Sequence, residues 1–287
     1  MPGVDLHTHS TASDGTLTPS ELVKAAKDAG LAAVALTDHD TVSGLPEALE
    51  AGKKYGIEVI PGCELSVSYD RGIMHIVGLW IDPYAPCLSE AFSRLVNSRE
   101  IRNRELVEKL TAVGYPVTYE EVEALATGTL GRPHFARALV HHGYVHSIEE
   151  AFQKLLGKDG KAYVPKIKIT AEDGIALLNS AGATAVLAHP CLLGVDDAQL
   201  DVELERLKGY GLEAIEVYYT SHTLEMTSAY KKAARKFGLL PSGGSDFHGS
   251  VKPEIRIGKG TGKLFVHHSV LDDLKALRQS KGLSVNF

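Results

Sequence analysis

Residues 4–9, Val4-Asp5-Leu6-His7-Thr8-His9, form a short apolar run that ends in two histidines. Similar runs recur further on: residues 32–37 (AAVALT) precede Asp38-His39-Asp40, and residues 57–62 (IEVIPG) precede Cys63-Glu64. Short apolar runs that alternate with helical stretches are typical of buried strands in a parallel sheet. We therefore predict that the chain begins as repeated strand–helix units.

Helix signals separate these strands. Residues 18–21 (TPSE) form a capping box with proline at the first helical position, and residues 43–55 have a helical pattern that Gly56 ends. Further strands are expected at residues 73–78, 184–188, 212–219 and 239–242, and further helices at residues 171–181, 224–237 and 269–280. About seven strand–helix units indicate an α/β fold, a (β/α)7 barrel with its helices outside.

Residues 88–156 interrupt this alternation, because they carry helical patterns and almost no strand signal. We predict helices at residues 89–113, 119–125, 133–142 and 148–156. The chain would then consist of a discontinuous barrel, residues 1–87 and 166–287, and a small helical insert, residues 88–165. We expect the insert to cover the active site.

Composition excludes several classes of protein. Three cysteines in 287 residues are too few for a disulfide scaffold, and they indicate a reducing compartment. No apolar run approaches the ~20 residues that span a bilayer, and the N-terminus has no signal-type segment. The formal net charge of −6 argues against a stable complex with long nucleic acid. We expect a cytoplasmic protein without membrane contact.

Many of the 13 histidines follow predicted strands together with carboxylates. His7 and His9 are two residues apart, so on a strand both side chains face the same side. In barrels of this type the active site lies at the carboxyl ends of the strands. Imidazoles and carboxylates gathered at one mouth predict a metal centre. The side chains in such positions are His7, His9, Asp14, Asp38, His39, Asp40, Glu64, His75, His189, Asp246 and His248.

These motifs resemble those of the polymerase-and-histidinol-phosphatase (PHP) family of phosphoesterases, whose barrel is a distorted one. The resemblance covers nearly the whole chain and rests, in order, on residues 7–10 (HTHS), 13–15 (SDG), 37–40 (TDHD), 61–64 (PGCE), 188–190 (AHP) and 244–248 (GSDFH). Residues 131–137 (GRPHFAR) and 216–222 (EVYYTSH) look most like the stand-alone members with a helical insert. That branch includes nucleoside 3′,5′-bisphosphate phosphatases and a 5′-to-3′ RNA exonuclease.

The resemblance implies a centre of three divalent ions. His7, His9, Glu64 and Asp246 would hold the first ion, Glu64 would bridge to a second completed by His75 and His189, and Asp14, His39 and His248 would hold the third. Ligands of this kind suit manganese, iron or zinc better than magnesium or calcium. Such a centre would lower the pKa of a bound water, so that a metal-bound hydroxide attacks the phosphate ester.

Substrate phosphate needs partners of its own, and arginine forms the bidentate contacts that phosphate prefers. Arg99 and Arg102 share a face of a predicted helix, whereas for Arg94 and Arg104 on the same helix interleaved glutamates offer surface ion pairing as an alternative. Arg132 lies near a helix N-terminus, which favours anions. We predict these three arginines as substrate-binding residues. His134 and His222 are candidates for phosphate contact or for catalytic protonation of the leaving group.

Other residues beside these motifs have two interpretations. Asp40 either orients an imidazole or caps the helix that follows Thr41 and Ser43. For Cys63 and Cys191 we favour packing over metal ligation.

The leading hypothesis is a metal-dependent phosphoesterase that acts on 3′,5′-bisphosphate nucleotides or on 5′-phosphorylated ends of short oligonucleotides. The alternative is a histidinol phosphate phosphatase or another small-molecule phosphomonoesterase, which would share the metal ligands. A hydrolase of C–N bonds and a non-catalytic metal-binding module are further alternatives. The arginines of the insert argue against the C–N hydrolase, and the complete ligand set argues against the module.

Overall fold

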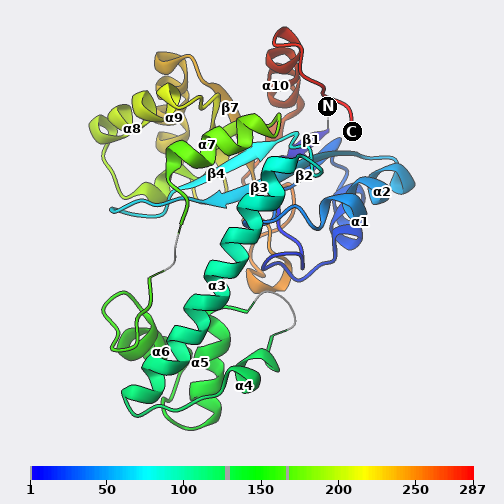
Figure 1. The fold of residues 1–287 in the computed structure, drawn as a ribbon. Coiled ribbons are helices and arrows are strands. Elements are labelled where there is room, and N and C mark those ends of the chain that lie inside the picture. The colour runs from blue at the N-terminus through cyan, green and yellow to red at the C-terminus, as the bar shows by residue number, and fades with distance from the viewer. Residues whose placement is uncertain (1, 127–129, 166–167) are drawn as a thin grey trace. The chain divides into compact units, whose positions relative to one another are not determined.

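The computed structural model describes residues 2–126, 130–165 and 168–287, apart from the side chains of Leu95, Val96 and Arg99. The chain divides into a barrel unit, Met1–Ser89 with Ile169–Phe287, and a helical unit, Glu90–Lys168 (Figure 1). That the helical unit covers the active site stays a prediction. Within the described ranges, no helix combines the length and the apolar character that crossing a membrane requires.

The barrel unit is built on one sheet of eight strands, in the order β7-β6-β5-β4-β3-β2-β1-β8. The strands are β1 (Gly3–Asp5), β2 (Ala33–Leu36), β3 (Glu58–Ser66), β4 (His75–Leu79), β5 (Thr184–Leu187), β6 (Ala214–Tyr219), β7 (Leu240–Gly244) and β8 (Val266–His267). Beyond β1 and β7 the backbone continues the pairing, since Leu6 N–H donates to Gly243 O (3.1 Å) and Asp246 N–H donates to His7 O (2.9 Å). These bonds join β1 to β7, so that the sheet forms a nearly closed barrel, which confirms the predicted fold class.

The strands are not all parallel, and in this respect the expectation of a purely parallel sheet was wrong. β4 runs antiparallel to both β3 and β5, and β8 runs antiparallel to β1. The reason for β4 is local: residues 67–74 join β3 to β4 as a hairpin, with no room for a crossover helix. The reversal places His75, the first residue of β4, opposite Ser66 at the carboxyl end of β3.

Helices follow most of the strands in the barrel unit. They are α1 (Pro19–Asp28), α2 (Leu45–Tyr55), α7 (Ala171–Ser180), α8 (Asp197–Gly209), α9 (Leu224–Phe237) and α10 (His268–Ser280). The capping box at Thr18 is confirmed, because its side chain accepts from Glu21 N–H while Glu21 binds back to Thr18 N–H. α8 was not predicted from the sequence, although Asp196 and Gln199 form a capping box at its start and Leu200, Leu204 and Leu207 form its buried face.

The helical unit has a core of its own. Its helices are most of α3 (Pro86–Ala112), then α4 (Tyr119–Glu123), α5 (Arg132–His141) and α6 (Ile148–Ala151), which a π-helical turn at Phe152–Leu156 extends. Leu106 and Leu110 of α3 pack with Phe135 and Leu139 of α5 in a buried cluster. The helical pattern of residues 88–156 is therefore confirmed, with boundaries that shift by a few residues.

Polar character changes along the barrel interior. Near the starts of the strands, Val4, Ala33, Ile60 and Val186 belong to one apolar core. At and beyond the carboxyl ends of the strands many buried residues are polar or charged, among them His7, His9, Glu64, His189, Asp246 and His248. Burying so many ionisable groups is costly unless they are paired or bind a metal. The site is therefore expected at this end of the barrel.

Candidate metal centre

Glu64, on β3, is the fully buried centre of the site. Its Oε1 atom lies 2.9 Å from His75 Nδ1 and 2.9 Å from His189 Nε2. Its Oε2 atom lies 3.1–3.2 Å from ring nitrogens of His7, His9 and His39. One carboxylate thus contacts five imidazoles that come from four different segments of the chain.

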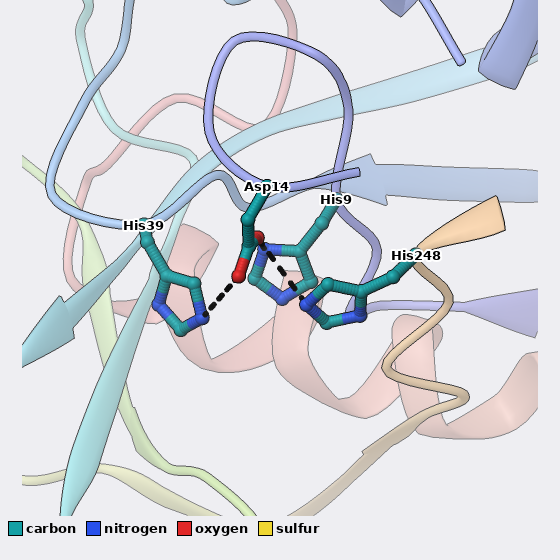
Figure 2. Close-up of side chains that lie close together, drawn as sticks. All are labelled: His9, Asp14, His39 and His248. Atoms are coloured by element: carbon teal, nitrogen blue, oxygen red, sulfur yellow. Dashed lines mark ion pairs between the residues drawn. The ribbon is translucent and has the colours of Figure 1, made fainter. Parts of the chain in front are cut away.

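The predicted ligands form three overlapping groups, and within each group the ligand atoms lie within 4.8 Å of one another. The groups are His7, His9, Glu64 and Asp246; His9, Asp14, His39 and His248; and His39, Glu64 and His75. Figure 2 shows the second group, with the Asp14 carboxylate between the rings of His39 and His248. His189 belongs to none of the three, but its contact with Glu64 brings it to the same place. All nine predicted ligands therefore meet at one end of the barrel.

The backbone around the centre is held in an uncommon conformation. Asp40, His189 and Asp246 have positive φ angles of 53°, 25° and 56°. Such non-glycine residues are strained and persist only where their surroundings hold them. Glycine is required at position 244, two residues before Asp246, because a Cβ atom there would lie 2.4 Å from His7 Cβ. The chain therefore bends sharply at the points where it delivers His189 and Asp246.

Two buried aspartates hold the segments that carry ligands. Asp38 accepts the N–H and the O–H of Ser10, both at 2.7 Å, next to His9. Asp5 accepts the N–H (2.8 Å) and the O–H (2.6 Å) of Ser245, next to Asp246. The sequence analysis missed both roles, because each depends on a pairing between segments far apart in the chain. Asp40 accepts the N–H of Ser66 (2.9 Å), so it anchors the end of β3.

Glu216, on β6, is a further residue that the sequence analysis missed. Its Oε1 atom lies 3.2 Å from His7 Nδ1, and its Oε2 atom accepts the N–H of His189 at 2.6 Å. A carboxylate in this position sets the ring orientation of an imidazole and leaves its other nitrogen for a ligand. The signal available in the sequence was its position in a predicted strand, residues 212–219. The structure confirms that strand as β6 and shows that only 2% of the surface of Glu216 is exposed.

We expect Glu216→Gln to weaken metal binding by the centre by about 10- to 100-fold, because carboxylates behind the ligands contribute effects of this size. Metal affinity measured by competition with a chelating dye checks the prediction. Glu213→Gln is the matched control, since Glu213 pairs with Lys281 outside the cluster. Equal metal affinities in the two variants would contradict the orienting role.

The carboxylates of the cluster are strongly acidic. Burial raises the pKa of Glu64, but its interactions with the surrounding imidazoles, those of His39 and His7 foremost, outweigh it and hold the pKa well below its usual value. For Asp246, burial is likewise outweighed, by the nearby imidazoles of His9 and His7, so that its pKa is lowered. Both side chains therefore stay ionised in a buried site, where negative charge requires a cation.

The imidazoles differ from one another. Burial lowers the pKa of His9, but Asp246 and Glu64 outweigh it and raise the pKa to about 9. In His39 burial dominates over the nearby Glu64 and lowers the pKa to about 3. At neutral pH His9 thus holds a proton that a metal ion would have to displace, whereas His39 offers a neutral ring.

Several buried polar atoms of the cluster have no hydrogen-bond partner among the residues that the structure describes. They are His7 Nε2, both ring nitrogens of His9, His39 Nδ1, Glu64 Oε2 and His189 Nδ1. Unpaired buried polar atoms of this kind need an explanation, such as a bound ion. Nitrogen and carboxylate oxygen are the ligands of zinc, manganese and iron, so the residues present fit a metal centre.

His222 lies in the barrel unit, and the ring of Tyr219 separates it from His189 of the cluster. Its ring packs against Tyr219 (5.2 Å between centroids), whose ring is 5.5 Å from that of His189. His222 Nδ1 lies 3.0 Å from Val217 O, and burial lowers the pKa of the ring. The structure thus places this candidate beside the centre rather than among its ligands.

The remaining substrate-binding candidates lie in the helical unit. Arg102 is buried and donates to Asn103 Oδ1 (2.8 Å), while Arg132 donates to Leu156 O (3.2 Å) and lies over the ring of Tyr163. His134 Nδ1 accepts Gly131 N–H (3.1 Å) and so helps to cap α5. Arg99 lies in α3, and its side chain is outside the described part of the chain. Substrate contact by these four residues stays a prediction.

Fold and site together define a barrel protein with clustered histidines and carboxylates that are able to bind metals. The family follows from comparison with known proteins: the model of the PHP domain matches residues 5–162, and the chain belongs to the PHP family. The resemblance found in the motifs is thereby confirmed.

Two curated relatives are similar over most of their length. A 5′-3′ exoribonuclease from Haemophilus influenzae is 36% identical over 244 residues, which cover 85% of this chain and 89% of the relative. A 3′,5′-nucleoside bisphosphate phosphatase from Chromobacterium violaceum is 36% identical over 250 residues, covering 86% and 88%. Among solved structures, an amidohydrolase from Chromobacterium violaceum with bound sulfate aligns with a TM-score of 0.79, at 33% identity over 96% of both chains.

Proposed function

We propose that this chain is a metal-dependent phosphoesterase that hydrolyses phosphate esters of nucleotides, either nucleoside 3′,5′-bisphosphates or 5′-phosphorylated ends of short oligonucleotides. The observation that carries the proposal is the buried Glu64 carboxylate, which lies within 3.2 Å of five imidazoles. The exoribonuclease and the bisphosphate phosphatase among its relatives support this substrate class. The net charge of −6 favours such small substrates over a stable complex with long nucleic acid.

Three divalent ions, of manganese, iron or zinc, are proposed for the three groups of ligands. The first group retains the predicted set of His7, His9, Glu64 and Asp246. For the second ion, both His75 and His189 lie 2.9 Å from Glu64 Oε1, which supports a bridging role for Glu64. When bound, the ions would supply Lewis acidity to the phosphate and acidify a water molecule. Their charge would exceed that of Asp14, Glu64 and Asp246, leaving a positive mouth suited to a phosphate dianion.

The role proposed for His222 follows from its hydrogen bond. With Nδ1 on Val217 O, the neutral ring carries its proton on Nδ1 and leaves Nε2 as an acceptor. Because burial lowers the pKa of the ring, the neutral form is favoured at neutral pH. His222 is therefore better suited to accept a hydrogen bond from a substrate hydroxyl than to protonate a leaving group. His134, whose pKa burial also lowers, remains a candidate for phosphate contact.

Arg132 is proposed to bind the phosphate that is not being hydrolysed. We expect Arg132→Ala to lower kcat/KM for a 3′,5′-bisphosphate at least about tenfold more than for a 5′-monophosphate, since a charged hydrogen bond to phosphate is lost only in the first case. Steady-state kinetics on both substrates check this. Arg104→Ala is the control, because Arg104 is an exposed residue of the same unit that pairs with Glu100. An equal loss for both substrates would contradict a selective role.

A panel of substrates tests the function. The metal-loaded protein would be assayed with a nucleoside 3′,5′-bisphosphate, a 5′-phosphorylated oligonucleotide, histidinol phosphate and an acyl amide. We expect the first two to be hydrolysed at least about tenfold more efficiently than the others. Hydrolysis of histidinol phosphate alone would identify the alternative phosphatase, and hydrolysis of the amide alone would contradict the phosphoesterase.

A further inference from the structure

The carboxylate of Asp246 faces two different surroundings with its two oxygen atoms. Its Oδ1 atom points to the ligand cluster, 3.2 Å from His9 Nε2 and 3.5 Å from His248 Nδ1. Its Oδ2 atom accepts a hydrogen bond from the hydroxyl of Tyr219 (3.1 Å) and one from Lys252 Nζ (2.9 Å). The side of Asp246 that faces away from the imidazoles therefore carries an ammonium group.

Lys252 reaches this position from the segment that follows β7. Only 8% of the Asp246 side chain is exposed, whereas 37% of the Lys252 side chain is exposed. The segment before Lys252 is held in place, because Ser250 N–H donates to Thr16 Oγ1 (2.9 Å) and Thr16 N–H donates to His248 O (3.2 Å). The ammonium group thus lies where the buried cluster meets solvent.

The ion pair with Asp246 uses only part of the hydrogen-bonding capacity of the Lys252 ammonium group. An ammonium group has three donors, and Asp246 Oδ2 takes one of them. Tyr219 already donates to the same oxygen, so a lysine is not needed to satisfy it. A phosphate ester whose oxygens approach Asp14, Glu64 and Asp246 through bound cations would come within reach of the remaining donors. A positive charge beside other cations is favourable only when an anion lies between them.

On these grounds we propose that Lys252 is a substrate-binding residue, and this rests on the proposed phosphoesterase function. Its ammonium group donates to a phosphoryl oxygen of the ester at the cluster while it keeps its hydrogen bond to Asp246 Oδ2. Lys252 would then be the contact to the reacting phosphate that the barrel unit itself contributes, whereas the predicted arginines all belong to the helical unit.

The test compares Lys252→Met and Lys252→Arg with the wild-type protein, all loaded with metal. Inorganic phosphate is the probe, with its affinity measured by calorimetry and the metal content measured by elemental analysis. We expect Lys252→Met to weaken phosphate binding and raise KM by about 10- to 100-fold, because a hydrogen bond to a charged group is lost. Metal content is expected to stay unchanged, and Lys252→Arg is expected to recover most of the affinity. Lys259→Met, at an exposed lysine of the same loop region, is the control and should bind phosphate as the wild type does.

Two results would overturn the proposal. Wild-type phosphate affinity in Lys252→Met would show that the ammonium group does not contact phosphate. A fall in metal content that parallels the loss of phosphate affinity would show that Lys252 acts by supporting Asp246 instead. Failure of the proposed function itself would be distinguishable, since wild-type protein would then bind metal and phosphate but hydrolyse none of the nucleotide substrates.

Discussion

Glu64→Gln is expected to lower hydrolysis of phosphate esters by at least about 1,000-fold, the largest effect of any single substitution in this chain. The amide has nearly the shape of the carboxylate, so the barrel should keep its packing. It removes, however, the negative charge that five imidazoles surround, and it points a donor N–H at ring nitrogens that need an acceptor or a cation. Phosphate release and metal content, measured on the same preparation, should fall together.

Glu58→Gln is the matched control for this experiment. Glu58 begins the same strand, β3, but pairs with Lys275, 2.7 Å away, outside the cluster. We expect its activity to stay within about twofold of the wild type, because a partly exposed ion pair contributes little. If Glu64→Gln retained wild-type activity with its metal bound, the central role of Glu64 would be wrong.

Removal of the metals is expected to have an effect of similar size. Dialysis against a strong chelator should lower activity by at least about 1,000-fold, since the remaining residues offer no equivalent Lewis acid. Manganese, iron or zinc should restore activity better than calcium, because the ligands are rich in imidazole nitrogen. Rate measurements before and after reconstitution, with elemental analysis at each step, check this. Full activity in protein shown to be free of metal would contradict the proposed chemistry.

Metal binding should also depend on pH in a defined direction. Burial lowers the pKa of His9, but Asp246 and Glu64 outweigh burial and raise the pKa to about 9. In the metal-free protein this protonated ring stabilises the fold below about pH 6.5, and that contribution is lost as the pH rises through about 9. A metal must displace this proton, so its affinity should rise by at least about tenfold per pH unit between about pH 7 and pH 9. Calorimetric titrations at several pH values measure the slope, and no pH dependence would contradict His9 as a ligand.

Much of the site was predictable because its ligands follow the strands in recognisable motifs. His7 and His9 follow β1, and His39, His189 and His248 follow other strands. They meet because barrel strands end at one mouth. His75 meets them for a different reason, the reversal of β4, which the sequence analysis did not foresee. The positions of the ligands relative to the strands were therefore enough to predict which residues form the site, even though the direction of β4 was not predicted correctly.

The supporting residues were not predictable in the same way. Asp5, Glu216 and Lys252 act through contacts with residues far away in the sequence or on the other side of a turn, such as the contact of Glu216 with His7. A lone buried aspartate or glutamate in a strand has no motif that separates it from an ordinary polar residue. Only the closure of the barrel, which sets Ser245 beside Asp5, shows what these side chains do.

Anomalous X-ray diffraction from crystals of the metal-loaded protein tests the central claim most directly. We expect three anomalous peaks, with Glu64 between two of them. The peaks should lie among His7, His9, Asp14, His39, Glu64, His75, His189, Asp246 and His248. A map without a peak beside Glu64, from protein that hydrolyses nucleotide phosphate esters, would contradict that claim.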